Sequence, residues 1–491
     1  MVSETPVAGL TAPDELSRRR RIGVLAICCM SLLIVGIDVT IVNVALPSIG
    51  KDFHASLSGL QWTVDAYTLV LASLLMISGS TADRLGRRRT FVIGLCTFAL
   101  GSLLCSLAPN LGTLVVFRMI QAVGGSMLNP VAMSIITNTF TVPRERAQAV
   151  GIWGAVVGVS MALGPVVGGL LVTSVGWRSI FFINIPIALA AVVLALRYIP
   201  ESKAAVARKV DVPGQLLVIA FLSTLTYGII ELPVKGVSSA VIIGAFTVAA
   251  VSLAAFLVWE RRAVQPLMDL RFFRSVPFSS ATVIAVAAFA ALGGFLFLNT
   301  LYLQDVRGLS ALQSGVDTLP MAAMTVLFSP ISGRIVGRRG ARIPLLVAGL
   351  ALTGSSLMLV GLGATTPFTW LFTAYVIFGI GFGLVNAPIT NAAVSGMPRA
   401  QAGVAAAIAS TSRQIGSTLG VAVTGSLVSA SLQKGSHIDF AVASRAGWWV
   451  LAGCGAIVLI LGQIATTSWA RATANRTAEA INPEFLEAHA A

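Results

Sequence analysis

Residues 151–169 read Gly-Ile-Trp-Gly-Ala-Val-Val-Gly-Val-Ser-Met-Ala-Leu-Gly-Pro-Val-Val-Gly-Gly, an apolar stretch without a single charge. Such a composition suits the interior of a bilayer, but a helix that only anchors a chain would use leucine. Glycine lets neighbouring helices approach closely, and proline opens the backbone hydrogen-bond ladder so that the helix can bend at Pro165. The stretch therefore predicts a membrane helix that packs closely against a partner and moves against it.

The whole chain has the composition of a membrane protein. Of its 491 residues, 56% are hydrophobic and 11% are charged, and the mean hydropathy is +0.89. The net charge of +14 is common in nucleic-acid-binding proteins, but here the charges lie in short segments between apolar runs, so we expect no nucleic-acid partner. The 5 cysteines and 3 histidines are scattered, and we expect neither a metal site nor a cofactor.

Long apolar runs predict fourteen membrane spans. The first follows Arg18–Arg21 and is too long for the apolar core of a signal peptide, so we interpret it as an uncleaved span. The predicted spans are 22–46, 57–80, 90–108, 111–138, 147–173, 178–200, 212–232, 239–259, 276–303, 312–334, 341–361, 368–393, 402–430 and 446–470.

The distribution of arginine and lysine predicts the orientation. With both termini inside, 24 of the 33 basic residues fall in cytoplasmic segments and 6 fall in external loops. One span more or fewer would reverse every later loop and destroy this asymmetry. The six external residues are Lys51, Arg178, Lys235, Arg307, Lys434 and Arg445, and three more basic residues, Arg118, Arg197 and Arg413, fall within spans.

An internal repeat divides the chain. The loop at 79–88 aligns with the loop at 333–342 without gaps, and Gly164 and Gly168 of span 5 match Gly416 and Gly420 of span 13. We therefore expect paired halves around a midplane site, as in secondary transporters. The predicted organisation is a cytoplasmic tail at 1–21, a six-helix bundle at 22–200, a linker with two extra spans at 201–275, a second six-helix bundle at 276–470 and a cytoplasmic tail at 471–491.

Five stretches carry a family resemblance: Asp38–Pro47, Gly79–Arg88, Arg118–Gly125, the glycine-proline stretch of span 5, and Trp177–Pro186. With these motifs the chain resembles the major facilitator superfamily, and within it the fourteen-span drug:proton antiporters, especially actinobacterial antibiotic and multidrug-resistance exporters. The resemblance implies an all-α integral membrane protein with the major facilitator fold, which consists of two six-helix bundles with two extra central helices. It also implies that an antiporter motif is formed by Gly154, Gly158, Gly164, Pro165, Gly168 and Gly169.

Three ionisable residues within spans are candidates for proton coupling. From the helical rise, Asp38 and Asp65 lie about 12 Å, and Arg118 about 10 Å, from the outer ends of their spans. The three charges are therefore expected to meet at one level. Asp38 is the preferred proton carrier, because desolvation and the charge of Arg118 act on it in opposite directions. The alternative is a permanent Asp38–Arg118 pair that only holds spans 1 and 4 together.

Further polar residues are candidates for a substrate cavity: Asn43, Tyr67, Gln121, Asp317 and Arg413. Asp317 would suit a cationic substrate. Arg413 would bind anionic groups, or else cap the carbonyl groups of a bent helix. Both alternatives remain open from the sequence.

The loop after span 2 has two interpretations. Basic residues at this place satisfy ordinary positive-inside anchoring. Alternatively, Asp83 accepts hydrogen bonds from the N-terminus of a neighbouring half-bundle helix and from Arg84, which would close the cytoplasmic side. The residues of this predicted latch are Gly79, Asp83, Arg84, Gly86, Arg87 and Arg88.

The favoured function is proton-coupled export of lipophilic drugs or antibiotics across the cytoplasmic membrane. The alternative is a dedicated exporter of one metabolite, such as a siderophore, an amino acid or a self-made antibiotic. We do not expect an enzyme, since the sequence lacks clustered catalytic or metal-ligand residues, nor ATP as the energy source, since it lacks a P-loop. We expect a monomer, with lipid, protons and a small molecule as partners, and we expect the glycines of span 5 to face span 13.

Overall fold

The structure is a computed structural model, and it describes residues 17–203, 211–263, 266–394, 402–433 and 439–481. Across these residues the chain is helical and contains no strand. Fourteen helical segments are long and apolar enough to cross a membrane, which confirms the predicted number of spans. Arg208, Lys209, Arg399 and Lys434, which entered the charge count, lie outside the described residues, as do His437 and His489.

The first half of the bundle contains six spans, the last of which is formed by two short helices in series. Its helices are α1 (Arg18–Phe53), α2 (Leu57–Leu85), α3 (Arg87–Ser106), α4 (Leu111–Thr139), α5 (Pro143–Ser174), α6 (Ser179–Phe182) and α7 (Asn184–Tyr198). Two inserted helices follow, α8 (Val212–Lys235) and α9 (Ala240–Arg262). A short 3₁₀ turn, η1 (Leu270–Arg274), leads into the second half.

The second half again contains six spans, and three of them are interrupted or continued by a shorter element. Its elements are α10 (Val276–Leu301), the π-helical turn η2 (Tyr302–Val306), α11 (Ala311–Asp317), α12 (Leu319–Arg339), α13 (Arg342–Leu359), α14 (Phe368–Val394), α15 (Ala402–Gln433), α16 (Phe440–Ala443) and α17 (Arg445–Ala465). Helix α18 (Ser468–Ile481) follows and packs against α10 and η1.

Local sequence explains several helix ends. Asn110 and Thr113 form a capping box in which each side chain bonds the backbone of the other, so α4 begins there. Gly86 has φ +110, a value that favours glycine, and this residue separates α2 from α3. The tight reversal after α2 therefore depends on a glycine that the sequence places in the predicted latch loop.

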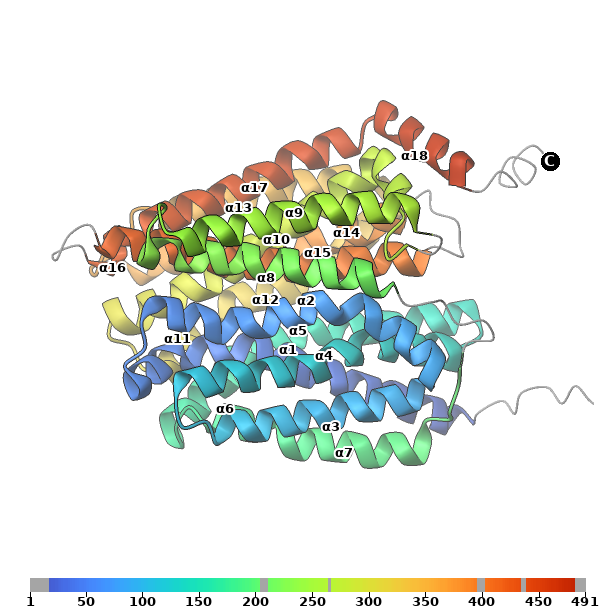
Figure 1. Ribbon diagram of the computed structural model, residues 1–491, viewed down its shortest axis with the longest axis horizontal. Helices are drawn as coiled ribbons and strands as arrows, with labels where there is room; N and C mark the ends of the chain where they lie inside the picture. The colour runs from blue at the N-terminus through green and yellow to red at the C-terminus, as the bar shows by residue number, and fades with distance from the viewer. Residues whose placement is uncertain (1–16, 204–210, 264–265, 395–401, 434–438, 482–491) are drawn as a thin grey trace, which may run out of the picture.

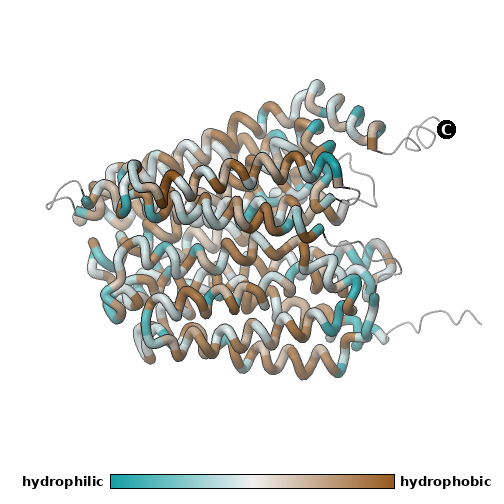
Figure 2. The backbone as a smooth tube through the Cα atoms, viewed as in Figure 1, coloured by the Kyte–Doolittle hydropathy of each residue, from teal (hydrophilic) through white to brown (hydrophobic). Residues whose placement is uncertain are grey.

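The two halves lie one above the other with their helices roughly parallel, and α8 and α9 cover one side of the bundle (Figure 1). Helix α8 packs against α9, α15 and α2, so it touches both halves. The hydrophobic residues concentrate in the middle of the helices, and hydrophilic residues lie towards their ends (Figure 2). This band is what a protein surrounded by lipid requires.

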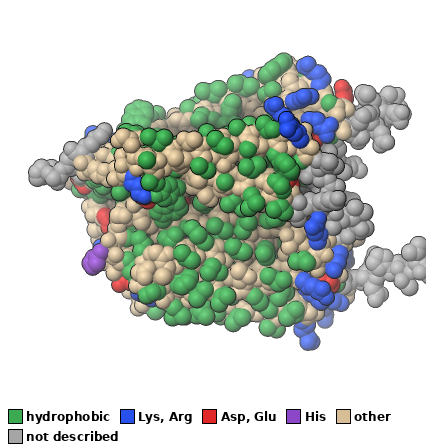
Figure 3. Space-filling view, viewed as in Figure 1, with side chains coloured by type: hydrophobic (Ala, Val, Ile, Leu, Met, Phe, Trp, Pro, Cys, Tyr) green, Lys and Arg blue, Asp and Glu red, His purple; other side chains and the backbone are tan. Residues whose placement is uncertain are grey.

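Lysine and arginine gather mainly at one end of the molecule (Figure 3). We call it the basic end: α1 begins there, α17 ends there, and it carries the loop between α2 and α3 and the loop between α12 and α13. The other end, where α1 ends at Phe53 and α2 begins at Leu57, is called the opposite end.

The glycine pairs of spans 5 and 13 make equivalent contacts in the two halves. A Cβ atom added to Gly164 or Gly168 would collide with Thr40 or Ile41 of α1, while one added to Gly416 or Gly420 would collide with α10. Each pair therefore lets one helix approach the first helix of its own half. The expectation that the α5 glycines face α15 is wrong: Gly164 and Gly168 contact α1 of their own half, and the α5 glycines that do contact the other half, Gly158 and Gly169, meet α12 and α11.

Contacts between the halves are closest at the opposite end. A Cβ on Gly169, near the end of α5, would lie 2.5 Å from the carbonyl oxygen of Ala311 in α11, whereas one on Gly158, midway along α5, would lie 3.1 Å from Val326 in α12. Towards the basic end the corresponding positions are open: no described atom lies within 4 Å of an added Cβ at Gly79, Gly151, Gly154, Gly333 or Gly337. Several glycine positions towards the basic end therefore have open space around them, although Met76 of α2 packs there against Phe278 and Ile408 of the second half.

Candidate functional site

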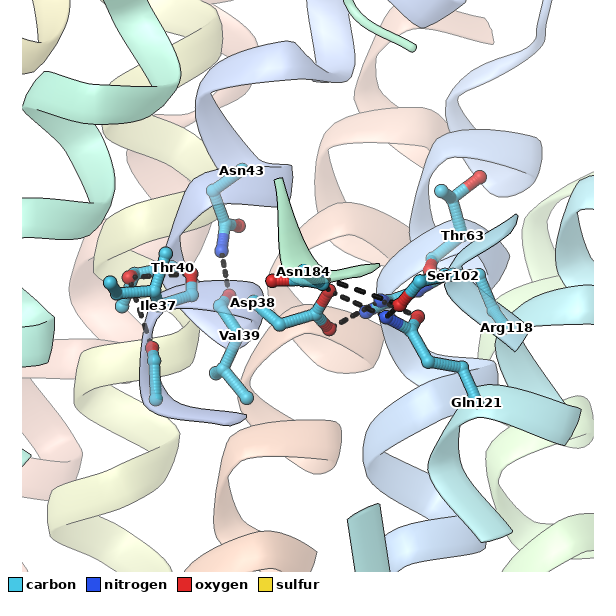
Figure 4. Close-up of polar contacts among 11 residues, drawn as sticks. Ile37, Asp38, Val39, Thr40, Asn43, Thr63, Ser102, Arg118, Gln121 and Asn184 are labelled. Carbon is cyan, nitrogen blue, oxygen red and sulfur yellow. Dashed lines mark hydrogen bonds and ion pairs between the residues drawn. The ribbon is translucent and has the colours of Figure 1, made fainter. Parts of the chain in front are cut away.

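A cluster of buried polar side chains joins four helices of the first half (Figure 4). Asp38 of α1 accepts a hydrogen bond at Oδ2 from Arg118 of α4 at 2.6 Å, and this contact is also an ion pair. Its Oδ1 accepts from Gln121 of α4 at 2.8 Å and from Asn184 of α7 at 3.0 Å. Gln121 also donates to Ser102 of α3 at 2.7 Å. Both oxygens of the carboxylate are thus satisfied by side chains.

The guanidinium group of Arg118 is held from several directions. Its Nε donates to the backbone carbonyl of Thr63 in α2 at 3.3 Å. Its charge lies 4.2 Å above the ring centroid of Tyr67 and 5.7 Å from that of Phe181. The side chains of Arg118 and Asp38 are 1% and 0% exposed, so this pair is isolated from solvent.

The Asp38 carboxylate is surrounded by hydrogen-bond donors. Three donors converge on its carboxylate, and two opposite charges compensate each other in a region of low dielectric constant. Protonation of Asp38 would leave the charge of Arg118 buried without a counter-charge, which costs several kcal/mol, on the order of 3–5. The two opposite charges of Asp38 and Arg118 are therefore held together as a buried pair.

Asp65 does not join this cluster, although its predicted depth is the same. It is fully buried, and neither carboxylate oxygen has a hydrogen-bond partner among the described residues. Residues two positions apart on a helix point in nearly opposite directions, so Asp65 lies away from Thr63 and Tyr67. The expectation that three charges meet is correct for Asp38 and Arg118 and wrong for Asp65.

The environment of Asp65 is the interface between the halves. Gln61 and Thr68, which share its helix face by spacing, both contact α15: Gln61 bonds two of its carbonyl groups, and Thr68 meets Thr418 at 2.8 Å. A buried carboxyl group without a donor is far less costly when it is protonated. The structure thus contains one buried carboxyl group that is paired with an arginine and one that has no described hydrogen-bond partner.

Asn184 and Ser102 were not predicted to be members of the site. Asn184 begins α7 and lies in the stretch Trp177–Pro186, which carries part of the family resemblance. Ser102 is one of several serines in apolar helices, and nothing in its local sequence distinguishes it. Only the packing of α3 and α7 against α1 and α4 reveals that both side chains reach Asp38 or its partner Gln121.

The predicted cavity residues do not form one group. Gln121 belongs to the Asp38 cluster, and Tyr67 lies beneath Arg118 with a buried hydroxyl group that has no described partner. Asn43 is 4% exposed and donates to the carbonyl of Val39 within its own helix. These three residues are buried in the first half.

The two candidates in the second half are more accessible. Asp317 ends α11 and is half-buried. Arg413 of α15 donates to Thr390 of α14 at 2.6 Å and lies 5.8 Å from the ring centroid of Phe289, while its Nε has no described partner.

The loop between α2 and α3 is tied within the first half. Asp83 accepts from Arg87 at 3.1 Å. Glu201, which follows α7, accepts from the backbone N–H groups of Arg88 at 3.1 Å and Arg89 at 3.3 Å, and so caps the start of α3. A Cβ on Gly86 would lie 2.5 Å from this carboxylate. Glu201 was not expected from the sequence, because it lies more than a hundred residues after the loop that it caps.

Comparison with known proteins agrees with this architecture. The sequence profile described as Major Facilitator Superfamily matches residues 28–421. "Multidrug resistance protein Stp" of Mycobacterium tuberculosis is 38% identical over 415 residues, covering 84% of this chain and 77% of that protein. The "Tetracenomycin C resistance and export protein" of Streptomyces glaucescens is 38% identical over 436 residues, covering 87% of this chain and 78% of that protein.

A solved D-xylose–proton symporter is similar in fold, with a TM-score of 0.64 at 14% identity, covering 90% of this chain and 97% of the symporter.

Proposed function

Because the chain belongs to the major facilitator superfamily, we propose that it is a proton-coupled antiporter that exports lipophilic drugs or antibiotics across the cell membrane by alternating access. Two relatives with 38% identity are named for multidrug resistance and for antibiotic resistance and export. The observation that carries the coupling is the ion pair of Asp38 and Arg118, since ionisable groups buried in a membrane protein are costly and commonly serve transport.

The orientation follows from charge. The basic end faces the cytoplasm in this proposal, because basic residues are retained on that side of bacterial membranes. Both termini are then cytoplasmic. With the halves packed at the opposite end and open at glycine positions near the basic end, the arrangement corresponds to the state that admits substrate from the cytoplasm.

Proton coupling uses two carboxyl groups in different states. Asp38 carries the transported proton after Arg118 separates from it, and Asp65, at the interface between the halves, responds when that interface opens to water. A transmembrane potential supplies about 2.3 kcal/mol per charge for each 100 mV. The free energy needed to separate the Asp38–Arg118 pair is about what one or two charges release when they move through a potential of 100 mV.

The remaining candidate residues have supporting roles in the proposal. Asn43, Tyr67, Gln121, Asp317 and Arg413 contact substrate once the halves separate. The loop that contains Gly79, Asp83, Arg84, Gly86, Arg87 and Arg88 closes the cytoplasmic side in the other state. The protein works as a monomer in the lipid bilayer.

The test is a susceptibility panel in cells that express the chain, with and without a protonophore. Increased resistance to several unrelated lipophilic compounds, lost when the proton gradient is dissipated, is the expected result. Resistance to a single compound would favour the second candidate, a dedicated exporter, for which the relative named after tetracenomycin C is the supporting observation. Resistance that survives the protonophore would contradict proton coupling.

A further inference from the structure

Two carboxyl groups meet where the inserted helices reach the basic end. Asp211 is the N-cap of α8, and its Oδ1 accepts from the backbone N–H of Gly214 at 3.1 Å and from Nε1 of Trp259 at 2.8 Å. Glu260 lies in the last turn of α9 and is 4% exposed. Its Oε2 accepts from the backbone N–H of Met268 at 3.0 Å. Each carboxyl group thus uses one oxygen for ordinary hydrogen bonds.

The two remaining oxygens lie close together. Oδ2 of Asp211 and Oε1 of Glu260 are both buried, and neither accepts a hydrogen bond from a described donor. Both lie near one point: the position that a Cβ on Gly214 would occupy is 2.4 Å from the first atom and 2.8 Å from the second. The two oxygens therefore lie within about 5 Å of each other. Two bare carboxylates in this geometry would repel each other strongly.

No basic side chain among the described residues compensates this pair. Arg261 and Arg262 follow Glu260 on α9 and are exposed. In the segment that leads to α10, Arg271 pairs with Asp269 at 2.8 Å and Arg274 is exposed. On the facing helix α2, the neighbouring contact is the backbone carbonyl of Ser73, which accepts from Gln215.

The ends of the two helices favour a negative charge on Asp211 over one on Glu260. A negative charge is favourable at the N-terminus of α8, where Asp211 caps the helix, and unfavourable in the last turn of α9, where Glu260 lies. Asp211 also accepts two hydrogen bonds at its Oδ1. A proton on Oε1 of Glu260, donated to Oδ2 of Asp211, would satisfy both remaining oxygens.

We propose that Asp211 and Glu260 bind one proton between them, and that this proton fastens the inserted helices to the segment that leads into α10. The inference goes beyond the proposed export function and does not depend on it. At low pH the shared proton joins α8 to α9 and keeps Glu260 in contact with Met268. When the pH rises and the proton is lost, repulsion between the two carboxylates loosens this junction.

A proton fits the site better than a metal ion does. Ca²⁺ binds six to eight oxygen atoms and Mg²⁺ requires six. The described residues supply only two uncommitted carboxylate oxygens here, and no group of three or more acidic, histidine or cysteine side chains occurs among them. A single hydrogen bond between two carboxyl groups needs no further ligand.

The junction connects both halves of the protein. Gln215, next to the pair on α8, donates to the carbonyl of Ser73 in α2 of the first half. Met268 packs against a cluster that includes Phe278 of α10 and Ile408 of α15 in the second half. The pair therefore senses the pH on the side of the basic end and acts on the elements that connect the halves.

The experiment measures hydrogen exchange in the full-length protein in detergent, from about pH 5 to about pH 9. Exchange of peptides that contain Gly214 and Met268 is compared with that of the unfolded chain at each pH. Wild-type protection should fall about tenfold as the pH rises, the equivalent of one hydrogen bond. In Glu260→Gln, the side-chain amide N–H donates to Asp211 and does not titrate. Protection should therefore remain at all pH values, and its pH dependence should disappear. Asp211→Asn should behave in the same way, because its amide donates to Glu260.

Glu231→Gln is the matched control, because this carboxylate lies on the same helix at the opposite end and already has Trp62 and Lys235 as partners. It should retain the wild-type pH dependence. Protection that is constant with pH in the wild type, or that falls equally in Glu260→Gln, would overturn the proposal. Restoration of wild-type protection at high pH by added Na⁺ or Ca²⁺ would also overturn it, in favour of a cation site. None of these readouts requires transport, so they are independent of the export function.

Discussion

Gln61 of α2 donates a hydrogen bond to the backbone carbonyl of Ala422 in α15 at 2.9 Å, and this contact crosses from one half of the protein to the other. The same Nε2 atom donates to Val421 at 3.2 Å. Gly425 provides the space, since a Cβ there would lie 2.5 Å from that atom. The side chain of Gln61 therefore packs against the backbone of α15 near the opposite end. These contacts must break before that end can open.

Replacement of Gln61 by alanine should shift the equilibrium towards the state that is open at the opposite end. The change removes two hydrogen bonds with a net value of about 1–3 kcal/mol together. Spin labels at Ser58 and Ser431 should show a larger population of long distances in Gln61→Ala. Gln433→Ala, which changes an exposed residue of α15 near the same end, should leave the distance distribution unchanged. An unchanged distribution in Gln61→Ala would show that this contact does not determine closure.

Asp38→Asn should abolish transport driven by a pH gradient while the protein still folds. Asparagine retains an acceptor for Gln121 and Asn184 but removes the titratable group and the counter-charge of Arg118. The measurement is substrate uptake into inverted vesicles with an imposed pH gradient. Full gradient-driven uptake by Asp38→Asn would exclude this residue as the proton carrier. Asp65→Asn is the comparison, and we expect a partial loss that depends on the substrate.

Much of the fold follows from sequence because membrane spans are governed by simple physics. Apolar length and the distribution of basic residues predict fourteen spans, and the structure contains fourteen segments of suitable length and hydropathy. The polar ends of helices are harder to predict. Helix α1 extends over Arg18–Phe53, beyond the predicted 22–46, because a helix continues past the edge of its apolar run.

The site is less predictable because depth along a helix is easier to estimate than direction around it. Asp38 and Asp65 have the same calculated depth, yet only Asp38 faces Arg118. A small error in helix rotation redirects a side chain to another neighbour. Contacts such as that between Glu201 and the start of α3 also join distant segments, and no local pattern encodes them.

Topology can be tested by labelling single cysteines in intact cells. Cysteines that replace Lys51 and Lys235 should react with an impermeant maleimide from outside, because both residues lie at the opposite end. Cysteines that replace Arg88 and Arg262 should react only after permeabilisation. Labelling of the Arg262 position in intact cells would contradict the orientation that places the basic end in the cytoplasm.

Glu201→Ala should destabilise the protein by about 1–2 kcal/mol, the usual cost of losing a helix cap. The carboxylate satisfies the N–H groups of Arg88 and Arg89, which lie in the first turn of α3. Thermal unfolding in detergent measures the effect. Glu479→Ala, an exposed position on α18, is the control and should leave the melting temperature unchanged. Equal stability of the two variants would mean that water replaces the cap without loss.

Leucine substitutions at two glycines of α5 can distinguish static packing from movement between the halves. Gly168 faces Ile41 of α1 within the first half, with an added Cβ 2.6 Å from that side chain, whereas Gly158 faces Val326 of α12 in the second half. Leucine at Gly168 should therefore lower yield and melting temperature, because the collision lies inside one half and cannot be relieved by movement of the halves. Leucine at Gly158 should preserve folding and substrate binding but abolish transport, because the extra volume separates surfaces that must slide past each other. Melting temperature, substrate binding and vesicle transport measured on both variants distinguish the two roles. A fall in the stability of Gly158→Leu in proportion to its activity would show that this contact, too, is static packing.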